Sequence, residues 1–219
     1  LNGDNAGLYG IRITYAKNGP HNKNLKTTYA VRGKGKGVYA QNLTITAAGY
    51  GIDFRKCDNH VIKRVMTCCY YNTFLVGGNN GVITGCLQNG TMIDRCGDPE
   101  LKHWLVDNED IFTLLFNPIL RESAKYIIAD KGNNQTIYNT FVYGCNTMIT
   151  INGAETLLAV NVGSDNLGIS GSQFDMKKGS ATGINAMRYN GRSYRNSGGQ
   201  LGLYNRLAID YTDEANGIY

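Results

Sequence analysis

A repeat of about 21 residues is the feature of this sequence that most constrains its fold. Residues 52–62 carry a short alternating strand, a turn that ends in Asn, and a second apolar pair. The same order returns at residues 73–83 and 127–137, and more loosely at residues 147–157. A single coil of this length cannot bury its apolar side chains alone, so each coil must stack on its neighbours. The repeat therefore predicts a solenoid.

The composition favours an all-β chain. Its 28 glycines and many asparagines suit frequent tight turns, because both residue types tolerate positive φ. We expect residues 1–219 to form one β-helix domain, with residues 97–123 as a long insertion and residues 17–36 as a solvated loop. Since the sequence starts at Leu1 without an initiator Met, we expect it to be a fragment of a longer chain.

The charge pattern limits the expected partners. The formal net charge is +5, and the basic residues are scattered rather than gathered into a nucleic-acid stripe. The sequence also contains no transmembrane run. We therefore expect neither nucleic acid nor a membrane as a partner. The lack of a signal peptide says little about export, and an extracellular or cell-surface location is the favoured expectation.

The six cysteines are predicted to be free thiols packed within or against the coils. They show no paired Cys-x-x-Cys spacing, so we expect no zinc site. The repeat places Cys57 and Cys96 in one column, with Gly78 between them. At about 4.8 Å per coil the two cysteines would lie roughly 10 Å apart, which is too far for a disulfide.

The pattern resembles the right-handed parallel β-helix of the pectin-lyase-like superfamily. The resemblance rests on the coil length, on β-branched residues at inward positions, and on Asn59, Asn80 and Asn134 at the recurring turn. It implies an all-β right-handed solenoid. Members are commonly polysaccharide lyases, glycoside hydrolases, sugar epimerases, or phage and surface binding proteins. The catalytic signatures of these subfamilies are missing, so the resemblance assigns no catalytic residue.

Aligning the repeats gives two neighbouring columns of side chains, one that points into the coil and one that points out of it. The inward column is predicted to contain Phe54, Leu75, Ile93, Ala129, Ile149 and Ile169. The outward column is predicted to contain Arg55, Val76, Asp94, Asp130, Thr150 and Ser170.

Asp94 and Asp130 form the candidate catalytic pair. If the insertion and one strand close a single long coil, the two carboxyl groups lie on adjacent rungs about 5 Å apart. This is the separation between the nucleophile and the acid of a retaining glycosidase. The alternative is that both carboxylates are solvated, or that they pair with Arg95 and Lys131.

Five further residues are candidates for substrate binding. Arg55 lies two rungs from the carboxylate pair in the predicted register. The insertion supplies His103, Trp104, Glu109 and Asp110, with the indole as a stacking platform for a sugar ring. The alternative is that these acidic groups only solvate the loop or form a weak Ca²⁺ site.

Two classes of function follow. The first is a carbohydrate-active enzyme, predicted to be a glycoside hydrolase, with a polysaccharide lyase as its near variant. The second is a non-catalytic glycan-binding β-helix, such as an adhesin or a tailspike-like segment. Both classes predict an oligo- or polysaccharide as the partner. We expect no cofactor and no metal, unless a lyase uses Ca²⁺, and assembly into a homo-oligomer stays open.

Overall fold

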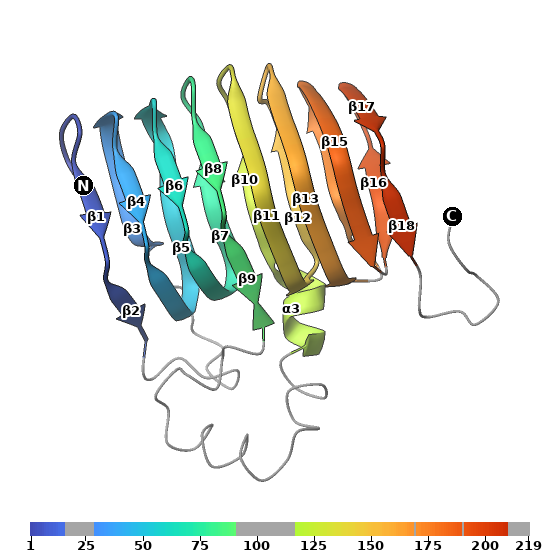
Figure 1. The fold of residues 1–219 in the computed structure, drawn as a ribbon, viewed down its shortest axis with the longest axis horizontal. Coiled ribbons are helices and arrows are strands. Elements are labelled where there is room, and N and C mark those ends of the chain that lie inside the picture. The colour runs from blue at the N-terminus through green and yellow to red at the C-terminus, as the bar shows by residue number, and fades with distance from the viewer. Residues whose placement is uncertain (16–28, 91–116, 169, 190, 210–219) are drawn as a thin grey trace, which may run out of the picture.

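The protein is a parallel β-solenoid of about seven turns, and 70% of its described residues lie in strands, with almost no helix among them. A computed structural model describes residues 1–15, 29–90, 117–168, 170–189 and 191–209. The turns stack in chain order from the N-terminal end to the C-terminal end (Figure 1). The all-β solenoid predicted from the repeat is therefore confirmed.

The strands are short and regular, and the described part of the chain adds one short helix. The strands are β1 (Gly7–Tyr9), β2 (Arg12–Thr14), β3 (Tyr29–Lys36), β4 (Tyr39–Gln41), β5 (Thr44–Asp58), β6 (Val61–Lys63), β7 (Met66–Val76), β8 (Val82–Thr84), β9 (Leu87–Asn89), β10 (Lys125–Ala129), β11 (Gln135–Cys145), β12 (Thr147–Asn152), β13 (Leu157–Leu167), β14 (Ser172–Lys178), β15 (Ser180–Tyr189), β16 (Arg192–Asn196), β17 (Gln200–Tyr204) and β18 (Leu207–Ile209). The helix is α3 (Asn117–Ser123).

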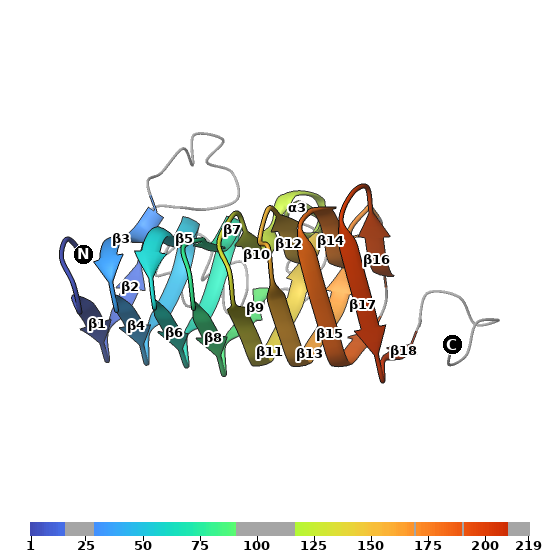
Figure 2. The same ribbon diagram turned by 90° about the horizontal axis from the view of Figure 1, so that it is seen from above.

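Every pairing between these strands is parallel, and the strands form rows along the solenoid axis. One row runs β3–β5–β7–β10–β12–β14–β16. A second row runs β1–β4–β6–β8–β11–β13–β15–β17. Long strands such as β11 extend over two sides of the coil. The first half of β11 pairs with β8, and its second half pairs with β9. Figure 2 shows the two rows on opposite sides of the molecule.

Columns of apolar side chains line the inner face of the first row. They are fully buried, and each takes one residue from each successive strand. One column is Ile52, Phe74, Ile127, Ile149 and Phe174, and the next is Phe54, Val76, Ala129, Ile151 and Met176. Burying a side chain of this size stabilises the fold by about 1.5–3 kcal/mol.

The predicted register was wrong by one residue in β7. Phe54 pairs with Val76, and Leu75 pairs with Asp53 on the outer face. Ile149 does point inward, but in the column of Ile52 rather than that of Phe54. A slip of one residue turns a side chain to the other face of a strand, so the prediction that Val76 points outward is also wrong.

Asparagines at the corners hold the coils in register. Asn59, Asn80 and Asn134 all have positive φ, between 53° and 57°. Their side-chain amides form a ladder, in which Asn80 donates to Asn59 and Asn134 donates to Asn80, each over 3.1 Å. A second ladder runs along another corner through Asn139, Asn161, Asn185 and Asn205. The recurring Asn of the sequence therefore has two roles, because it tolerates the left-handed turn and links adjacent coils.

Part of the predicted solvated loop is a strand. Residues 29–36 form β3, which pairs with β5. Within β3, Val31 is buried and points into the coil, while Arg32 and Lys34 are exposed. The high content of glycine and lysine concealed this alternation in the sequence. Residues 17–28 of the same prediction lie outside the described residues.

The helix α3 lies directly before β10 and packs against β7 and β11. β10 pairs with β7 on one side and with β12 on the other. The chain between β9 and β10 therefore adds no rung between Val76 and Ala129. Most of the predicted insertion, including its apolar run 111–116, lies outside the described residues.

The five described cysteines are free and buried, as predicted: Cys57, Cys68, Cys69, Cys86 and Cys145. Cys57, Gly78 and Gly132 stack on successive coils. A Cβ built on Gly78 would meet the backbone oxygen of Cys57, and one built on Gly132 would meet the backbone oxygen of Gly78. Gly132 thus occupies the position that the sequence analysis gave to Cys96. Cys96 itself lies outside the described residues.

We expect these thiols to be inert in the native protein. Burial raises the pKa of Cys57 and Cys86 to about 11 and that of Cys69 to about 12, so the reactive thiolate is scarce at neutral pH. Titration with a thiol reagent without reductant should find at most one fast-reacting group in the folded chain and about six after denaturation. Rapid reaction of several thiols at native stability would contradict the packed interior.

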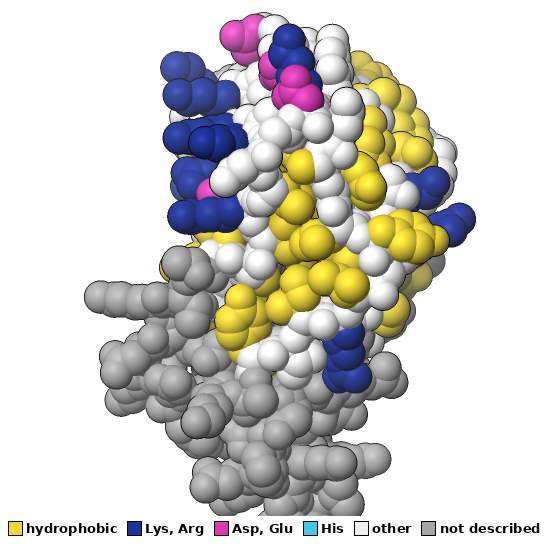
Figure 3. Space-filling model, turned by 90° about the vertical axis from the view of Figure 1, so that its left-hand side faces the viewer, with side chains coloured by type: hydrophobic (Ala, Val, Ile, Leu, Met, Phe, Trp, Pro, Cys, Tyr) yellow, Lys and Arg dark blue, Asp and Glu magenta, His cyan; other side chains and the backbone are white. Residues whose placement is uncertain are grey.

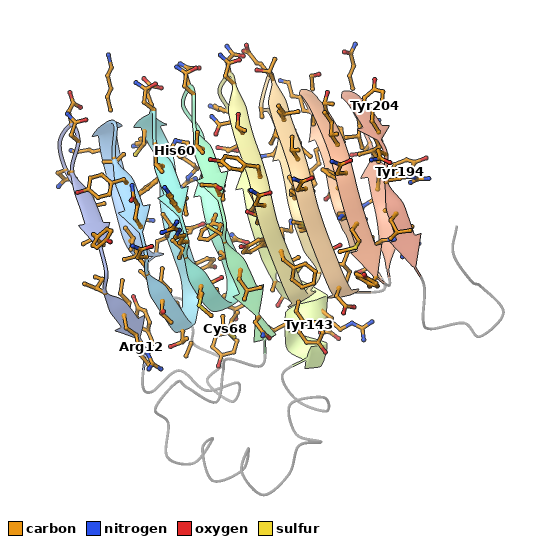
Figure 4. The ribbon with its side chains drawn as sticks, in the orientation of Figure 1. Arg12, His60, Cys68, Tyr143, Tyr194 and Tyr204 are labelled. Carbon is orange, nitrogen blue, oxygen red and sulfur yellow. The ribbon has the colours of Figure 1, made fainter. Side chains whose placement is uncertain are left out.

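His60 is a buried polar group inside the solenoid (Figure 4). Its Nδ1 lies 2.9 Å from the carbonyl oxygen of Cys57, and its ring meets the edge of Phe54 at 6.0 Å between centroids. Its Nε2 has no hydrogen-bond partner among the described residues. Burial lowers the pKa of His60, because the charged imidazolium would lose its hydration there.

This histidine should make the fold sensitive to mild acid. The pKa of His60 is lower in the folded protein than its value near 6.5 in the unfolded chain. At a pH between these two pKa values, the unfolded chain therefore binds more protons than the folded protein. Stability is then fully present above pH of about 6.5 and falls as the pH is lowered, by at most about 1.4 kcal/mol per pH unit. Urea unfolding between about pH 7.5 and 5.5 should show this slope in the wild type and a flatter slope in His60→Gln. Equal slopes in both proteins would assign the acid sensitivity to other groups.

Candidate functional site

Of the predicted carboxylate pair, only Asp130 lies among the described residues. The rungs on both sides of Asp130 are occupied, since its N–H donates to Val76 O over 2.9 Å and its Oδ1 accepts from the amide of Asn152 over 2.9 Å. β7 pairs directly with β10 and therefore occupies the rung that the predicted register gave to Asp94. Asp94 itself lies outside the described residues, so a catalytic role for the two carboxylates stays a prediction.

The other predicted site residues divide between two parts of the chain. His103, Trp104, Glu109 and Asp110 lie outside the described residues, and their roles stay predictions. Arg55 lies on the outer face of β5 and lines a hollow of about 270 Å³.

The hollow is formed by neighbouring coils at the N-terminal end of the first row. Its lining is almost entirely charged or polar: Asn2, Arg32, Gly33, Lys34, Asp53, Arg55 and Lys56. Strands β3 and β5 position these side chains by parallel pairing, with Arg32 opposite Asp53. Figure 3 shows Lys and Arg side chains gathered along one edge of the molecule in the view of this end. The lining carries four cations and one carboxylate.

Asp53 is the centre of the hollow. Its carboxylate accepts two hydrogen bonds from the Arg55 guanidinium, from Nε over 3.0 Å and from an Nη over 2.8 Å, and a third from the backbone N–H of Arg55 over 3.2 Å. Arg32 approaches the same carboxylate to 3.6 Å from the neighbouring rung. The Asp53 side chain is 11% exposed, whereas those of Arg32 and Arg55 are 60% and 42% exposed. The arginines therefore retain surface that a ligand can contact.

The charges in the hollow keep Asp53 ionised. Burial by itself would raise its pKa, but the hydrogen bonds from Arg55 and the charges of Arg55 and Arg32 outweigh burial and lower the pKa. The same contact raises the pKa of Arg55. A carboxylate held in this state at neutral pH accepts hydrogen bonds and cannot act as a general acid.

Three half-buried tyrosines lie beside the hollow, and one of them, Tyr71, packs against the core. The ring of Tyr50 lies 5.0 Å from that of Tyr29 and 5.4 Å from that of Tyr71, measured between centroids. The Arg32 guanidinium lies 5.5 Å from the ring centroid of Tyr29, which links this stack to the hollow. Burial is the main cause that raises the pKa of Tyr29. The rings stack on one another at tilts of 37° and 34°, so they offer edges and hydroxyl groups rather than free faces.

The hollow combines two kinds of recognition. Its arginines and lysines suit a carboxylate or sulfate group, and a guanidinium can bind such a group through two parallel hydrogen bonds. The ionised Asp53 would repel a simple anion, but it can accept hydrogen bonds from hydroxyl groups. A ligand with both anionic groups and hydroxyl groups fits this arrangement best.

The outward position of Arg55 was predicted from the sequence, but the other residues of the hollow were not. Arg32 and Lys34 were assigned to a loop, and Asp53 was not considered as an outward residue. The signal that could have found them is the alternation of Val31 and Gly33 with Arg32 and Lys34, which is typical of a strand with one polar face.

A second hollow, of about 320 Å³, lies on the outer side of β11, β13 and β15. Phe141, Gly163 and Met187 follow one another in register along it, and the missing side chain at Gly163 creates the depression. Amides of the second asparagine ladder line its rim. Its lining holds no charged group, so it offers less specific chemistry than the hollow around Asp53.

Neither a metal site nor a membrane segment is found in the described part of the chain. No three His, Cys, Asp or Glu side chains come together there as ligands for a metal ion. No helix among these residues is long and apolar enough to span a membrane.

The fold and the hollow define a class of protein: a parallel β-solenoid with a cationic, aspartate-centred hollow on one outer face. Comparison with protein-family models, with curated proteins and with solved structures gave no match.

Proposed function

We propose that this protein binds an acidic oligo- or polysaccharide in the hollow formed by Arg32, Lys34, Asp53, Arg55 and Lys56. The observation that carries the proposal is the nearly buried carboxylate of Asp53, surrounded by half-exposed cations on a rigid sheet. The cations bind the acidic groups of the glycan, and Asp53 accepts hydrogen bonds from its hydroxyl groups. The tyrosine hydroxyl groups beside the hollow add further donors and acceptors.

The proposal assigns the chain to the glycan-binding side of the pectin-lyase-like resemblance. The asparagine ladder through Asn59, Asn80 and Asn134 supports that resemblance, because the recurring turn residue on which it rests links successive coils. Cleavage of the bound glycan by Asp94 and Asp130 is a separate prediction, which binding does not require.

The direct test removes two cations from the hollow. In Arg32→Gln/Arg55→Gln we expect the affinity for a uronic acid hexasaccharide, measured by calorimetry, to fall at least about tenfold, which corresponds to about 1.4 kcal/mol. The matched control is Lys63→Gln/Arg64→Gln, which removes the same charge at exposed positions of β6 and its following turn. The control should bind within about twofold of wild type.

Circular dichroism and the thermal midpoint must show that both variants are folded. Equal losses in the two variants would mean that net charge, and not the hollow, attracts the ligand. A single-stranded oligodeoxynucleotide of equal charge that binds as tightly as the hexasaccharide would overturn the choice of a glycan.

A further inference from the structure

The outer column that contains Asp53 has a second aspartate and a second arginine at its other end. In register, successive strands of the first row place the following residues one above the other: Arg32, Asp53, Leu75, Ile128, Thr150, Asp175 and Arg195. The order is Arg–Asp at the N-terminal end and Asp–Arg at the C-terminal end. The column thus carries the same pair of side chains twice, in mirrored order.

The contact of Arg195 with Asp175 repeats that of Arg32 with Asp53, between adjacent strands of the first row. Arg195 Nε lies 3.4 Å from Asp175 Oδ1, with the Asp175 side chain 4% exposed and that of Arg195 47% exposed. Lys125 and Lys177 lie close to this pair. Burial lowers the pKa of Lys125, and the neighbouring charges of Lys177 and Arg195 lower it further. Each end of the column therefore has a nearly buried carboxylate under cations that remain half-exposed.

The middle of the column has no charge to compete with the two ends. Leu75, Ile128 and Thr150 occupy the three rungs between the aspartates, and none of them is ionisable. Asp130 lies near this stretch on β10's rung, and its carboxylate is engaged by Asn152. The cations that could hold the anionic groups of a ligand therefore lie at the ends of the column, while Leu75 and Thr150 between them are nearly buried.

The distance between the two ends follows from the stacking of the coils. Asp53 and Asp175 are four rungs apart, and at about 4.8 Å per rung this separates them by about 19 Å along the solenoid axis. The arginines at the two ends of the column are six rungs apart, or about 29 Å. A ligand that contacts both ends must be a chain of several sugar units.

We propose that the two ends of this column hold one linear acidic polysaccharide at two points, along the solenoid axis, and that the protein selects glycans long enough to bridge the ends. The inference rests on the proposed function and specifies its ligand. Because the coils are rigid and stacked in register, the spacing of the two contacts is fixed before binding. Once one end of the column has bound the ligand, binding at the other end is intramolecular. The affinity therefore rises when the ligand is long enough to reach both ends.

The test compares a uronic acid disaccharide with a decasaccharide of the same sugar by calorimetry. We expect two disaccharides per wild-type chain and one decasaccharide per chain, with the decasaccharide bound at least about tenfold more tightly. Lys177→Gln/Arg195→Gln should lose one of the two disaccharides and most of the gain from length. The charge-matched Lys63→Gln/Arg64→Gln should keep both, and thermal melting checks that each variant is folded.

The outcomes separate this inference from the proposed function. If the disaccharide binds at the hollow around Asp53 but the decasaccharide binds no more tightly, the proposed function stands and two-point binding is wrong. The same conclusion follows if Lys177→Gln/Arg195→Gln binds the decasaccharide like wild type. If neither ligand binds to the wild type, both proposals are overturned.

Discussion

Replacement of Phe54 by alanine is expected to lower the free energy of unfolding by about 3–5 kcal/mol. Phe54 is fully buried in an inward column between β3 and β7, and its ring contacts His60. The cavity left by the ring would lie at the centre of stacked, hydrogen-bonded coils that cannot close on it without changing the rung spacing. Urea unfolding at neutral pH measures the loss.

Phe141→Ala is the matched control for this change. Phe141 lies on the outer side of β11 and is half-buried against Gly163. Its removal should cost about 1 kcal/mol. A loss of less than about 1 kcal/mol in Phe54→Ala, or an equal loss in the two variants, would contradict the inward position of Phe54.

Gly132→Ala is expected to destabilise the fold by about 4 kcal/mol or more, for a different reason. Gly132 has a φ of +94°, and a Cβ built on it would lie 1.5 Å from the backbone oxygen of Gly78 on the neighbouring rung. That oxygen belongs to the main chain of a stacked coil, so it cannot move aside as a flexible side chain would. The substitution should therefore force adjacent coils apart at this corner.

Gly85→Ala separates the steric effect from the conformational one. Gly85 also has a positive φ, +61°, but its nearest neighbour would be Arg64 Cγ at 3.7 Å, which is ordinary contact. This variant should lose only the roughly 1–2 kcal/mol that a left-handed conformation costs an L-residue. Similar unfolding free energies for the two alanine variants would show that the coils near Gly132 can separate easily.

The fold could be predicted from the sequence because each coil repeats the same physical requirements. A buried alternating strand and a left-handed corner return about every 21 or 22 residues, as the pairs Asn59 and Asn80 or Phe54 and Val76 show. Few other architectures need a tolerant turn residue at such a short, constant interval. The corners were therefore easier to predict than the strands between them.

The register within the strands was harder to predict, since β7 lacks a clear alternation. Phe74, Leu75 and Val76 are all apolar and all buried, so hydrophobicity cannot show which of them points inward. Leu75 is covered on the outer face, in line with Asp53 and Ile128. Tertiary packing determines that a leucine takes the outward position next to Asp53, and the repeat alone does not encode this position.

The candidate site was only partly predictable for the same reason. Phe54 was correctly predicted to point inward, so the outward position of the next residue, Arg55, was also predicted. The inserted segment misled the count of rungs, because β7 pairs directly with β10 and no repeat of the sequence shows where a coil is interrupted. The pairing of Arg32 with Asp53 joins residues 21 positions apart and appears only when β3 is recognised as a strand.

The central claim is that the hollow around Asp53 recognises the acidic groups of a glycan. The most direct measurement is the affinity of the wild-type protein for a uronic acid hexasaccharide and for its fully methyl-esterified form, at the same ionic strength. The two ligands differ only in charge, so the cations of the hollow should favour the acidic form at least about tenfold, with a preference that weakens as salt is added. Equal affinity for the two forms, or binding of neither, would contradict the account.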